Sequence, residues 1–349
     1  MTIEEQIRES LEEVLVPGAT RSLVKLNLIR NISVSDEKAN ITLASTALSP
    51  KSQEWLKTKV SDTAKGLSGI KKARVDFGEA TPRELNEVKH IVAIMSGKGG
   101  VGKSLVTSLI GISLARRGFE VGILDADITG PSIPRIFGIS GRPVGSQSGI
   151  MPALSHLGIS IMSINLLLPN ESDAVIWRGP LIAKIITQFW EDVLWGKLDY
   201  LLVDLPPGTA DAPLTVMQTL PLSGVVIVFS PQELAAMVVK KAMQMAQKLS
   251  VPIIGVVENM SYFLLPDSGK RIELFGKSRG DEMAKAAGAP LLGQLPIDPE
   301  LPRLCDEGDI ERYESAALSS LSDAFLKAMS TIGKRVTMNP LSPGGRELE

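Results

Sequence analysis

The sequence contains one cysteine, Cys305, among its 349 residues. A disulfide within the chain is therefore excluded, because a bridge needs two thiols. Aromatic residues make up only 4% of the chain, while hydrophobic residues of all kinds make up 44%. A folded core of this protein must therefore consist mainly of Val, Ile, Leu, Ala and Met side chains.

The sequence also has little charge of one sign and no long apolar run. Its longest apolar stretches, such as GVVIVF, are much shorter than the roughly 20 residues that cross a bilayer. The net charge is −2, which gives no general attraction to nucleic acid or anionic lipid. The N-terminal MTIEEQIRESLEEVL lacks the basic and then apolar pattern of a signal peptide. We therefore expect a cytoplasmic protein that binds neither nucleic acid nor membranes.

The first part of the chain predicts a small α+β unit. Apolar residues at helical spacing precede a Pro-Gly stop, and short apolar runs follow on either side of a second helical stretch. The predicted order is helix 4–15, strand 23–32, strand 39–44, helix 52–67 and strand 73–77.

From His90 onward the pattern changes to short, almost continuously apolar runs that alternate with helical stretches. Such runs are typical of strands buried on both faces of a parallel sheet, and the alternation favours a doubly wound α/β fold. The predicted strands are HIVAIM, EVGILD, ISIMSI, YLLVDL, GVVIVF, IIGVVE and PLLGQLP, and the predicted helices are 104–117, 180–195, 234–249 and 312–332. We therefore expect four segments: an α+β domain at 1–80, a linker at 81–89, an α/β domain at 90–335 and a disordered tail at 336–349.

A phosphate-binding loop follows the first of these strands. The run GKGGVGKS fits the pattern G-x-x-x-x-G-K-[ST] and opens a predicted helix. Glycines let successive backbone N–H groups point at phosphate oxygens, and the helix N-terminus favours the anion. We expect Lys103 to reach the β- and γ-phosphates and Ser104 to bind Mg²⁺. The predicted nucleotide-binding residues of the loop are Gly97, Lys98, Gly99, Gly100, Val101, Gly102, Lys103 and Ser104.

Two further strands end in carboxylates. Asp125 and Asp127 follow VGIL, and Asp204 follows YLLV; ligands of open α/β sheets bind at such carboxyl ends. We expect Asp125 and Asp204 to lie at the Mg²⁺ and Asp127 to orient or activate the attacking water. Gly208 can approach the γ-phosphate closely because it has no side chain. Strand-end aspartates also serve as turn or helix caps, which is the alternative for Asp125 and Asp127.

These segments together resemble the Mrp family of ATPases. The resemblance rests on SGKGGVGKS, LDADITGPS, WRGP, DLPPGT, SPQELA, VENMSYF and IDPELPRLCDEGD, and it covers about residues 85–335. Members are bacterial and archaeal iron–sulfur cluster carrier proteins related to the MinD and ParA ATPases. The stretches LNLIRNI and IKKARV resemble the small iron–sulfur assembly domain that is often fused in front of them.

The resemblance implies a slow ATPase that works as a homodimer. The loop KGGVGKS is the deviant Walker A signature, in which Lys98 reaches the partner subunit's nucleotide and acts much as an arginine finger does. Asn259 would hydrogen-bond the adenine edge, and Asp211 and Pro231 would lie near the nucleotide. The implied partners are apo iron–sulfur proteins or assembly factors.

The sequence departs from the family where a cluster would be held. A C-x-x-C pair usually follows the ENMSYF stretch, and thiolates are the usual ligands of such clusters. Here Leu265 and Ser268 stand in those positions, and the N-terminal unit has STALSPKS where a cysteine is usual. Cys305 is more simply an ordinary small side chain. An iron–sulfur cluster therefore lacks its usual ligands in this chain.

Two functions stay open. The first is an ATPase in iron–sulfur cluster assembly or transfer, with direct ligation in doubt. The second is a cluster-free MinD- or ParA-like switch that positions or regulates a partner. Isolated His90 and His156 are interpreted as structural, and Met237, Met243 and Met245 as core residues. Trp177 lies in the family segment WRGP, and its residue type alone indicates no role. Arg178 could contact nucleotide, a partner or a surface carboxylate.

Overall fold

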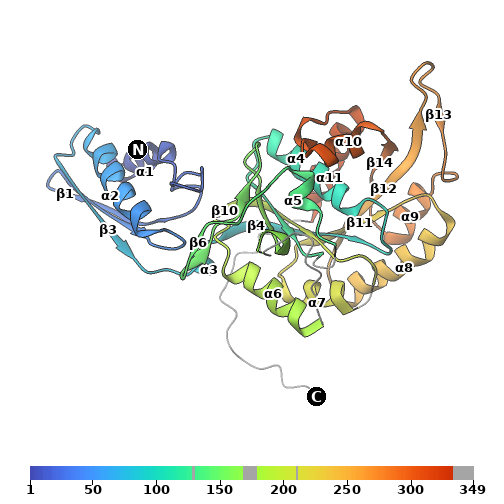
Figure 1. The fold of residues 1–349 in the computed structure, drawn as a ribbon, viewed down its shortest axis with the longest axis horizontal. Coiled ribbons are helices and arrows are strands. Elements are labelled where there is room, and N and C mark those ends of the chain that lie inside the picture. Colours follow the sequence, from blue (N-terminus) through green and yellow to red (C-terminus); the bar gives the residue numbers. More distant parts are fainter. Residues whose placement is uncertain (128–129, 168–178, 210, 333–349) are drawn as a thin grey trace.

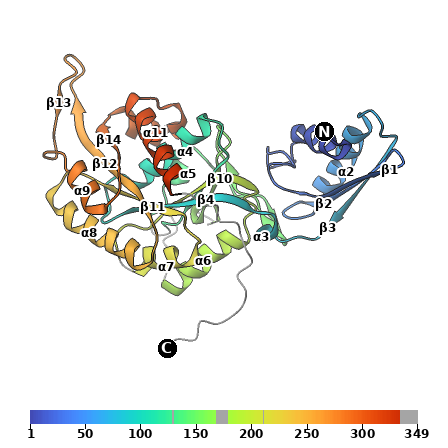
Figure 2. The ribbon, with the colours of Figure 1, turned by 180° about the vertical axis from the view of Figure 1, so that it is seen from behind.

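The computed structural model describes residues 1–127, 130–167, 179–209 and 211–332. A small N-terminal unit lies beside a larger α/β unit, as Figures 1 and 2 show from opposite sides. Trp177, Arg178 and the predicted tail at 336–349 lie outside the described residues. Within the described part of the chain, no helix is long and apolar enough to cross a bilayer.

The N-terminal unit is a three-stranded sheet covered by two helices. The sheet has the order β1-β2-β3, with β1 antiparallel and β3 parallel to β2. Ala39, Ile41 and Leu43 alternate with exposed or half-buried neighbours along β2, so one face of the sheet is apolar. The elements are α1 (Ile3–Ser10), η1 (Leu11–Glu13), β1 (Ile29–Ser35), β2 (Lys38–Ala44), α2 (Pro50–Lys65) and β3 (Lys72–Gly78).

The strand predicted at 23–32 begins only at Ile29. Residues before it form a turn in which Leu26 N donates to Ser22 O and Asn27 adopts a left-handed φ of 56°. The apolar side chains of Leu23, Leu26 and Leu28 are buried in the core of the unit. The apolar run was therefore wrongly predicted as a strand, because periodicity alone does not distinguish a buried turn from a short strand.

The α/β unit has a nine-stranded, mainly parallel sheet, which confirms the predicted fold class. Its strand order is β13-β12-β11-β4-β10-β5-β9-β8, with β14 also paired to β12; β8 and β13 are the antiparallel members. The strands are β4 (Glu87–Ser96), β5 (Val121–Asp125), β8 (Ala153–Leu154), β9 (Ser160–Ser163), β10 (Lys197–Asp204), β11 (Gly224–Phe229), β12 (Ile253–Leu264), β13 (Arg271–Ile272) and β14 (Leu291–Ile297); a separate hairpin is β6 (Gly145–Ser146) with β7 (Gly149–Ile150).

Helices cover both faces of this sheet. One face carries α4, α5, α10 and α11, and the other carries α6, α7 and α8 (Figure 1). Strands β5 and β11 are buried along their whole length, as expected for strands covered on both faces. The helices are α4 (Lys103–Arg116), α5 (Ile133–Ile136), α6 (Gly179–Glu191), α7 (Asp211–Thr219), α8 (Glu233–Lys248), α9 (Gly280–Ala287), α10 (Glu300–Glu307) and α11 (Ala316–Thr331), with short 3₁₀ turns η2 (Ile164–Leu166) and η3 (Ile310–Arg312).

The predicted helix 180–195 ends at Glu191, four residues early. Val193 makes a bridge to Ile150, and the indole of the fully buried Trp195 donates to Phe189 O. Between them, Leu194 packs in the core of the N-terminal unit, and Trp195 O accepts from Arg21, so the last residues of the predicted helix join the two units. The predicted helix 312–332 likewise begins only at Ala316, where the Ser315 side chain caps it.

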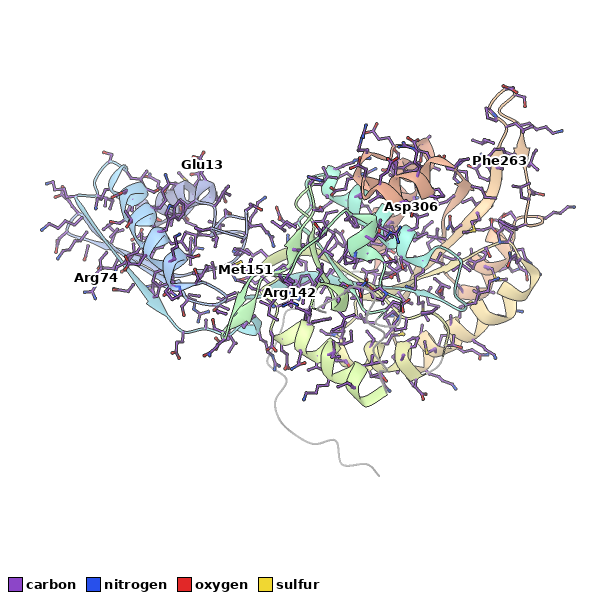
Figure 3. The ribbon with its side chains drawn as sticks, in the orientation of Figure 1. Glu13, Arg74, Arg142, Met151, Phe263 and Asp306 are labelled. Carbon is purple, nitrogen blue, oxygen red and sulfur yellow. The ribbon has the colours of Figure 1, made fainter. Side chains whose placement is uncertain are left out.

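The two units share a buried polar junction. Arg21, which is only 5% exposed, donates to Ser160 Oγ and Trp195 O at 3.0 Å each and pairs with Glu120 at 3.1 Å. Met151 of the α/β unit packs into the core of the N-terminal unit and lies at the boundary in Figure 3. The predicted linker, residues 81–89, contains the short helix α3 (Pro82–Leu85) and the start of β4.

Strand β12 continues beyond the sheet and pairs with β13 to form a projecting hairpin (Figure 1). Phe263, labelled in Figure 3, lies on this projection. The hairpin starts at the carboxyl end of β12, next to the phosphate loop, because Asn259 of β12 contacts Val101 of that loop.

Candidate functional site

The loop GKGGVGKS connects β4 to α4 at the carboxyl edge of the parallel sheet. Gly100 and Gly102 both have a φ of 78°, a conformation that side chains other than glycine rarely adopt. A Cβ on Gly102 would also lie 2.2 Å from Asn259 Nδ2. Gly102 is the N-cap of α4, whose 14 residues follow directly. The loop thus presents backbone N–H groups and a helix N-terminus at one place, which suits an anion.

A cavity of about 310 Å³ lies over this loop. It is open on one side, and its wall combines loop backbone with one lysine and one aspartate. The residues that line it are Ser96, Gly99, Gly100, Gly102, Lys103, Ser104, Leu105, Asp127, Ser132, Ile136 and Pro207. Its volume lies in the range of small-ligand sites, and the few polar groups in its wall, chiefly Lys103 and the loop backbone, suit a phosphorylated ligand.

Asp204 is at the centre of the charged groups behind the cavity. Its carboxylate is completely buried at the end of β10. Oδ2 accepts from Lys103 Nζ at 2.7 Å and from Ser104 Oγ at 2.5 Å, while Oδ1 accepts from Thr107 Oγ1 at 2.8 Å. This carboxylate therefore accepts hydrogen bonds from both side chains that are predicted to bind phosphate and Mg²⁺.

Asp125 lies beside Asp204, since β5 and β10 pair in parallel and place these two residues in register. Its carboxylate is completely buried and accepts from Ser163 Oγ at 3.1 Å and from the backbone N–H groups of Asp127 and Ile133. Burial raises the pKa of Asp125 to about 8, and the neighbouring Asp204 adds to that rise. A proton on Asp125 at neutral pH lowers the repulsion within this cluster.

Asp127 reaches the cavity itself. Its carboxylate lies 3.7 Å from Lys103 Nζ and belongs to the cavity wall. The structure therefore brings Lys103, Ser104, Asp127 and Asp204 together, and their roles stay predictions. Gly208 lies close by, where its N–H donates to Ser96 O at 3.0 Å and its φ of 93° requires glycine.

Lys98 points in another direction from Lys103. Its ammonium group donates to Gln232 Oε1, just before α8. Its own carbonyl accepts from Ser96 Oγ at 3.0 Å, which fixes the loop backbone at this residue. The two lysines of the signature therefore have separate partners within one chain.

Asn259 lies against the outer side of the loop and is almost completely buried. Its amide donates to Val101 O at 2.9 Å. Its contact with adenine stays a prediction, because the structure shows only this loop contact. Asp211 is the first residue of α7, and Pro231 is buried just before Gln232.

The positions of the missing thiols lie at the tip of the β12–β13 hairpin. Leu265 N donates to Lys270 O at 3.0 Å and closes the turn, and Ser268 is exposed within it. Cys305 is half-buried in α10, where burial and then Asp306 raise the pKa of its thiol. Among the described residues, no group of three or more His, Cys, Asp or Glu is arranged to hold a metal ion.

The N-terminal segment STALSPKS is at the boundary between the units rather than in a pocket. Thr46 is fully buried and donates to Ala80 O, and Ala47 N donates to Ser148 Oγ of the β6–β7 hairpin at 3.1 Å. This contact places the segment against the α/β unit.

The remaining residues are structural, as far as the described residues show. His90 stacks on Tyr200 at a centroid distance of 5.3 Å, and burial lowers its pKa. His156 is exposed. Met243 and Met245 are buried in the core, as predicted; the side chain of Met237 lies outside the described residues.

Sequence reasoning missed two residues of the site, Thr107 and Gln232. Thr107 lies one helical turn after Lys103, and i,i+4 spacing on α4 is the signal that could have identified it. Gln232 had no comparable signal, because its contact with Lys98 joins positions 134 residues apart.

Fold and loop together define a P-loop NTPase of the MinD and ParA type. Residues 87–333 match the family described as the NUBPL iron-transfer P-loop NTPase within ParA, and residues 4–77 match the family described as iron-sulfur cluster assembly protein. The chain therefore belongs to the iron-transfer P-loop NTPase family, with an assembly-type domain in front.

Relatives extend over both units. A protein named iron-sulfur cluster carrier protein from Synechocystis is 37% identical over 340 residues, which cover 93% of this chain and 94% of that protein. A protein of the same name from Clostridium perfringens is 46% identical over 65% of this chain and 82% of its own length. These names confirm the resemblance found in the sequence.

Solved structures agree with the fold. A nucleotide-binding protein in complex with ADP from Archaeoglobus fulgidus is 47% identical, with a TM-score of 0.61, over 67% of this chain and 93% of that one. The MinC:MinD complex from Aquifex aeolicus is 19% identical with a TM-score of 0.51 over 69% of this chain and 96% of that one, a likeness of fold alone.

Proposed function

We propose that this protein is a slow, Mg²⁺-dependent ATPase that acts in iron–sulfur cluster assembly or in cluster transfer to apo-proteins. The single observation that carries the ATPase is the cavity over the glycine loop, whose wall holds Lys103, Ser104 and Asp127 in front of the buried Asp204. The cluster pathway is supported by the names of the relatives, of which the Synechocystis protein covers both units.

ATP binding would change the partners of Asp204. The triphosphate attracts the ammonium group of Lys103 to its β- and γ-oxygens, and the loop amides bind the remaining charge. Ser104 and Asp204 fit Mg²⁺, because a hydroxyl and a buried carboxylate already lie 2.5 Å apart at the cavity edge. When bound, Mg²⁺ neutralises charge that develops on the phosphate oxygens.

Hydrolysis transfers the γ-phosphoryl group to water, so that the bond to the β-phosphate oxygen breaks and ADP and phosphate are formed. We assign to Asp127 the orientation of the attacking water, because it is the carboxylate that reaches the cavity. Asp125 has a positioning role in this proposal: both of its oxygens accept protein hydrogen bonds, one of them from the N–H of Asp127.

Lys98 supports a dimeric enzyme. Within one chain it pairs with Gln232, whereas Lys103 pairs with Asp204 and Asp127. A second subunit that covers the open side of the cavity would give Lys98 a phosphate to neutralise across the interface. We therefore propose a homodimer with ATP at its interface.

Cluster handling is a separate matter from ATP hydrolysis. The carrier proteins named above are relatives, whereas this chain has Leu265 and Ser268 at the hairpin tip and one half-buried thiol. We propose that the ATP-driven dimer assists assembly or transfer while another protein supplies the thiolates. Apo-proteins or assembly factors are then its partners.

Calorimetry with Mg·ATP and a phosphate-release assay test the ATPase. Saturable binding and slow, Mg²⁺-dependent release of phosphate are expected. Failure of the purified protein to bind Mg·ATP would overturn the proposal.

Anaerobic transfer of a cluster from a loaded donor to an apo-protein tests the pathway. Acceleration by this protein with ATP, but not with a non-hydrolysable analogue, is expected. If ATP is hydrolysed and transfer does not change, the cluster-free switch that positions or regulates a partner is the better function.

A further inference from the structure

Thr107 contacts Asp204 from the side away from the cavity. It lies on α4, one turn after the phosphate loop, and its side chain is completely buried. Its hydroxyl lies 2.8 Å from Asp204 Oδ1. The other carboxylate oxygen, Oδ2, accepts from Lys103 at 2.7 Å and from Ser104 at 2.5 Å.

The three donors differ in what a ligand does to them. Lys103 and Ser104 line the cavity and would turn to phosphate and Mg²⁺ when the nucleotide binds. Thr107 is behind the cavity wall and has no ligand to turn to. Of these three contacts, the one to Oδ1 is therefore the contact that can persist in the loaded enzyme.

The Thr107 hydroxyl has one proton and two acceptors within reach. Besides Asp204 Oδ1, it lies 3.0 Å from Lys103 O, the usual acceptor for a threonine on a helix. A carboxylate is the stronger acceptor because it is charged. The Thr107 hydroxyl therefore donates its hydrogen bond to Asp204 Oδ1 whenever that carboxylate is ionised.

We propose that Thr107 is a positioning residue for Mg²⁺: by holding Oδ1, it fixes the rotation of the Asp204 carboxylate so that Oδ2 faces the metal. This inference rests on the proposed function, since it assumes that Mg·ATP is the ligand. It adds a residue that acts through Asp204 without touching nucleotide or metal. Such an outer contact typically changes metal affinity by 10- to 100-fold.

The test is Thr107→Val, which keeps the branched shape and removes the donor. Oδ1 then lacks its partner in a buried place, and the carboxylate can rotate away from the metal. We expect the Mg²⁺ concentration for half-maximal ATP hydrolysis to rise about tenfold. Binding of ATP in EDTA, which Lys103 and the loop amides provide, should stay within about twofold of the wild-type value.

Ser108→Ala is the matched control. Ser108 is the next residue of α4, is equally buried, and donates to the backbone oxygen of Ser104 at 2.8 Å. Removing its hydroxyl costs a buried hydrogen bond and leaves Asp204 unchanged. Thr107→Ser, which restores the hydroxyl, should return the Mg²⁺ response to the wild-type range.

Each outcome decides between the possibilities. The inference is supported if Thr107→Val needs a higher Mg²⁺ concentration while Thr107→Ser and Ser108→Ala respond to Mg²⁺ as the wild-type protein does. A Mg²⁺ response equal to that of Ser108→Ala overturns it. An equal loss of ATP binding with and without Mg²⁺, together with a lower melting temperature, also overturns it, because the role is then structural. Wild-type protein that binds no Mg·ATP refutes the proposed function instead.

Discussion

The phosphate loop and the β12–β13 hairpin begin at the same edge of one sheet, but the loop belongs to a buried, charged site, whereas the tip of the hairpin is mostly exposed and has no thiol. Lys103, Ser104 and Asp204 are connected by hydrogen bonds of 2.5–2.7 Å in a buried site. The hairpin has Leu265 and Ser268 where thiolates would stand and projects into solvent (Figure 1). The loop thus has the side chains for nucleotide binding, whereas the hairpin tip has no thiolate to bind a cluster.

Burial explains why the two regions differ in what a substitution does. In the loop, each charged group compensates another, so the loss of one leaves a buried charge without its partner. At the hairpin tip the side chains are mostly exposed, and a change there alters the surface with little effect on stability. Four variants test this contrast, from the largest expected effect to the smallest.

Lys103→Ala should have the largest effect. It removes the ammonium group that compensates Asp204 and would bind the phosphates, so both Mg·ATP binding and hydrolysis should be abolished. Calorimetry measures the affinity, and circular dichroism at rising temperature shows whether the variant is folded. Tight binding by a folded variant would contradict the assignment of this loop.

Lys98→Ala should separate binding from hydrolysis. In the proposed dimer this lysine acts across the interface, so turnover should fall about 10³-fold while single-chain affinity changes little. Gln232→Ala is the matched control, because it removes the partner of Lys98 within one chain and keeps the lysine. Unchanged turnover in Lys98→Ala would remove the role of this residue in trans.

The pair Leu265→Cys and Ser268→Cys should give the hairpin the chemistry that it lacks. Two thiols per subunit supply four ligands in a dimer, enough for about one cluster per dimer. Iron and sulfide analysis after anaerobic reconstitution should show a cluster in the double variant and none in the wild-type protein. Cluster binding by the wild-type protein would show that other ligands, such as Cys305, are used.

Asp125→Asn should have the smallest effect, seen mainly in the pH dependence of stability, because its contact with Asp127 is to the backbone N–H of that residue. The pKa of Asp125 is raised from 3.8 to about 8 in the folded protein. The folded state therefore holds this proton more tightly than the unfolded chain, and the resulting stability is full below about pH 4 and lost as the pH rises through 8.

The variant should show a flatter decrease of unfolding free energy between pH 5 and 8, measured by urea denaturation in EDTA. Asp267→Asn, on the exposed hairpin, is the control and should follow the wild-type curve. Parallel curves for all three proteins would mean that Asp125 is not the group responsible.

Much of the site could be predicted because its residues are local or stand at strand ends. The glycine loop is a run of eight residues between a strand and a helix, and parallel strands bring their carboxyl ends to one edge. The predictions failed at two buried apolar runs: residues 23–28 form a turn in the N-terminal core, and residues 192–195 follow the end of α6 and join the two units. No local pattern distinguishes such residues from a strand or helix interior.

The sequence by itself determined the P-loop, the mainly parallel sheet and the absence of paired thiols, because each depends on residue type and near spacing. Tertiary structure decided which polar and charged groups contact one another. Thr107 donates to Asp204, Lys98 donates to Gln232, and Asp125 is buried beside a second carboxylate. These contacts join residues far apart in the chain. Their distances and burial exist only once the strands are paired, since burial and the local electric field belong to the packed protein.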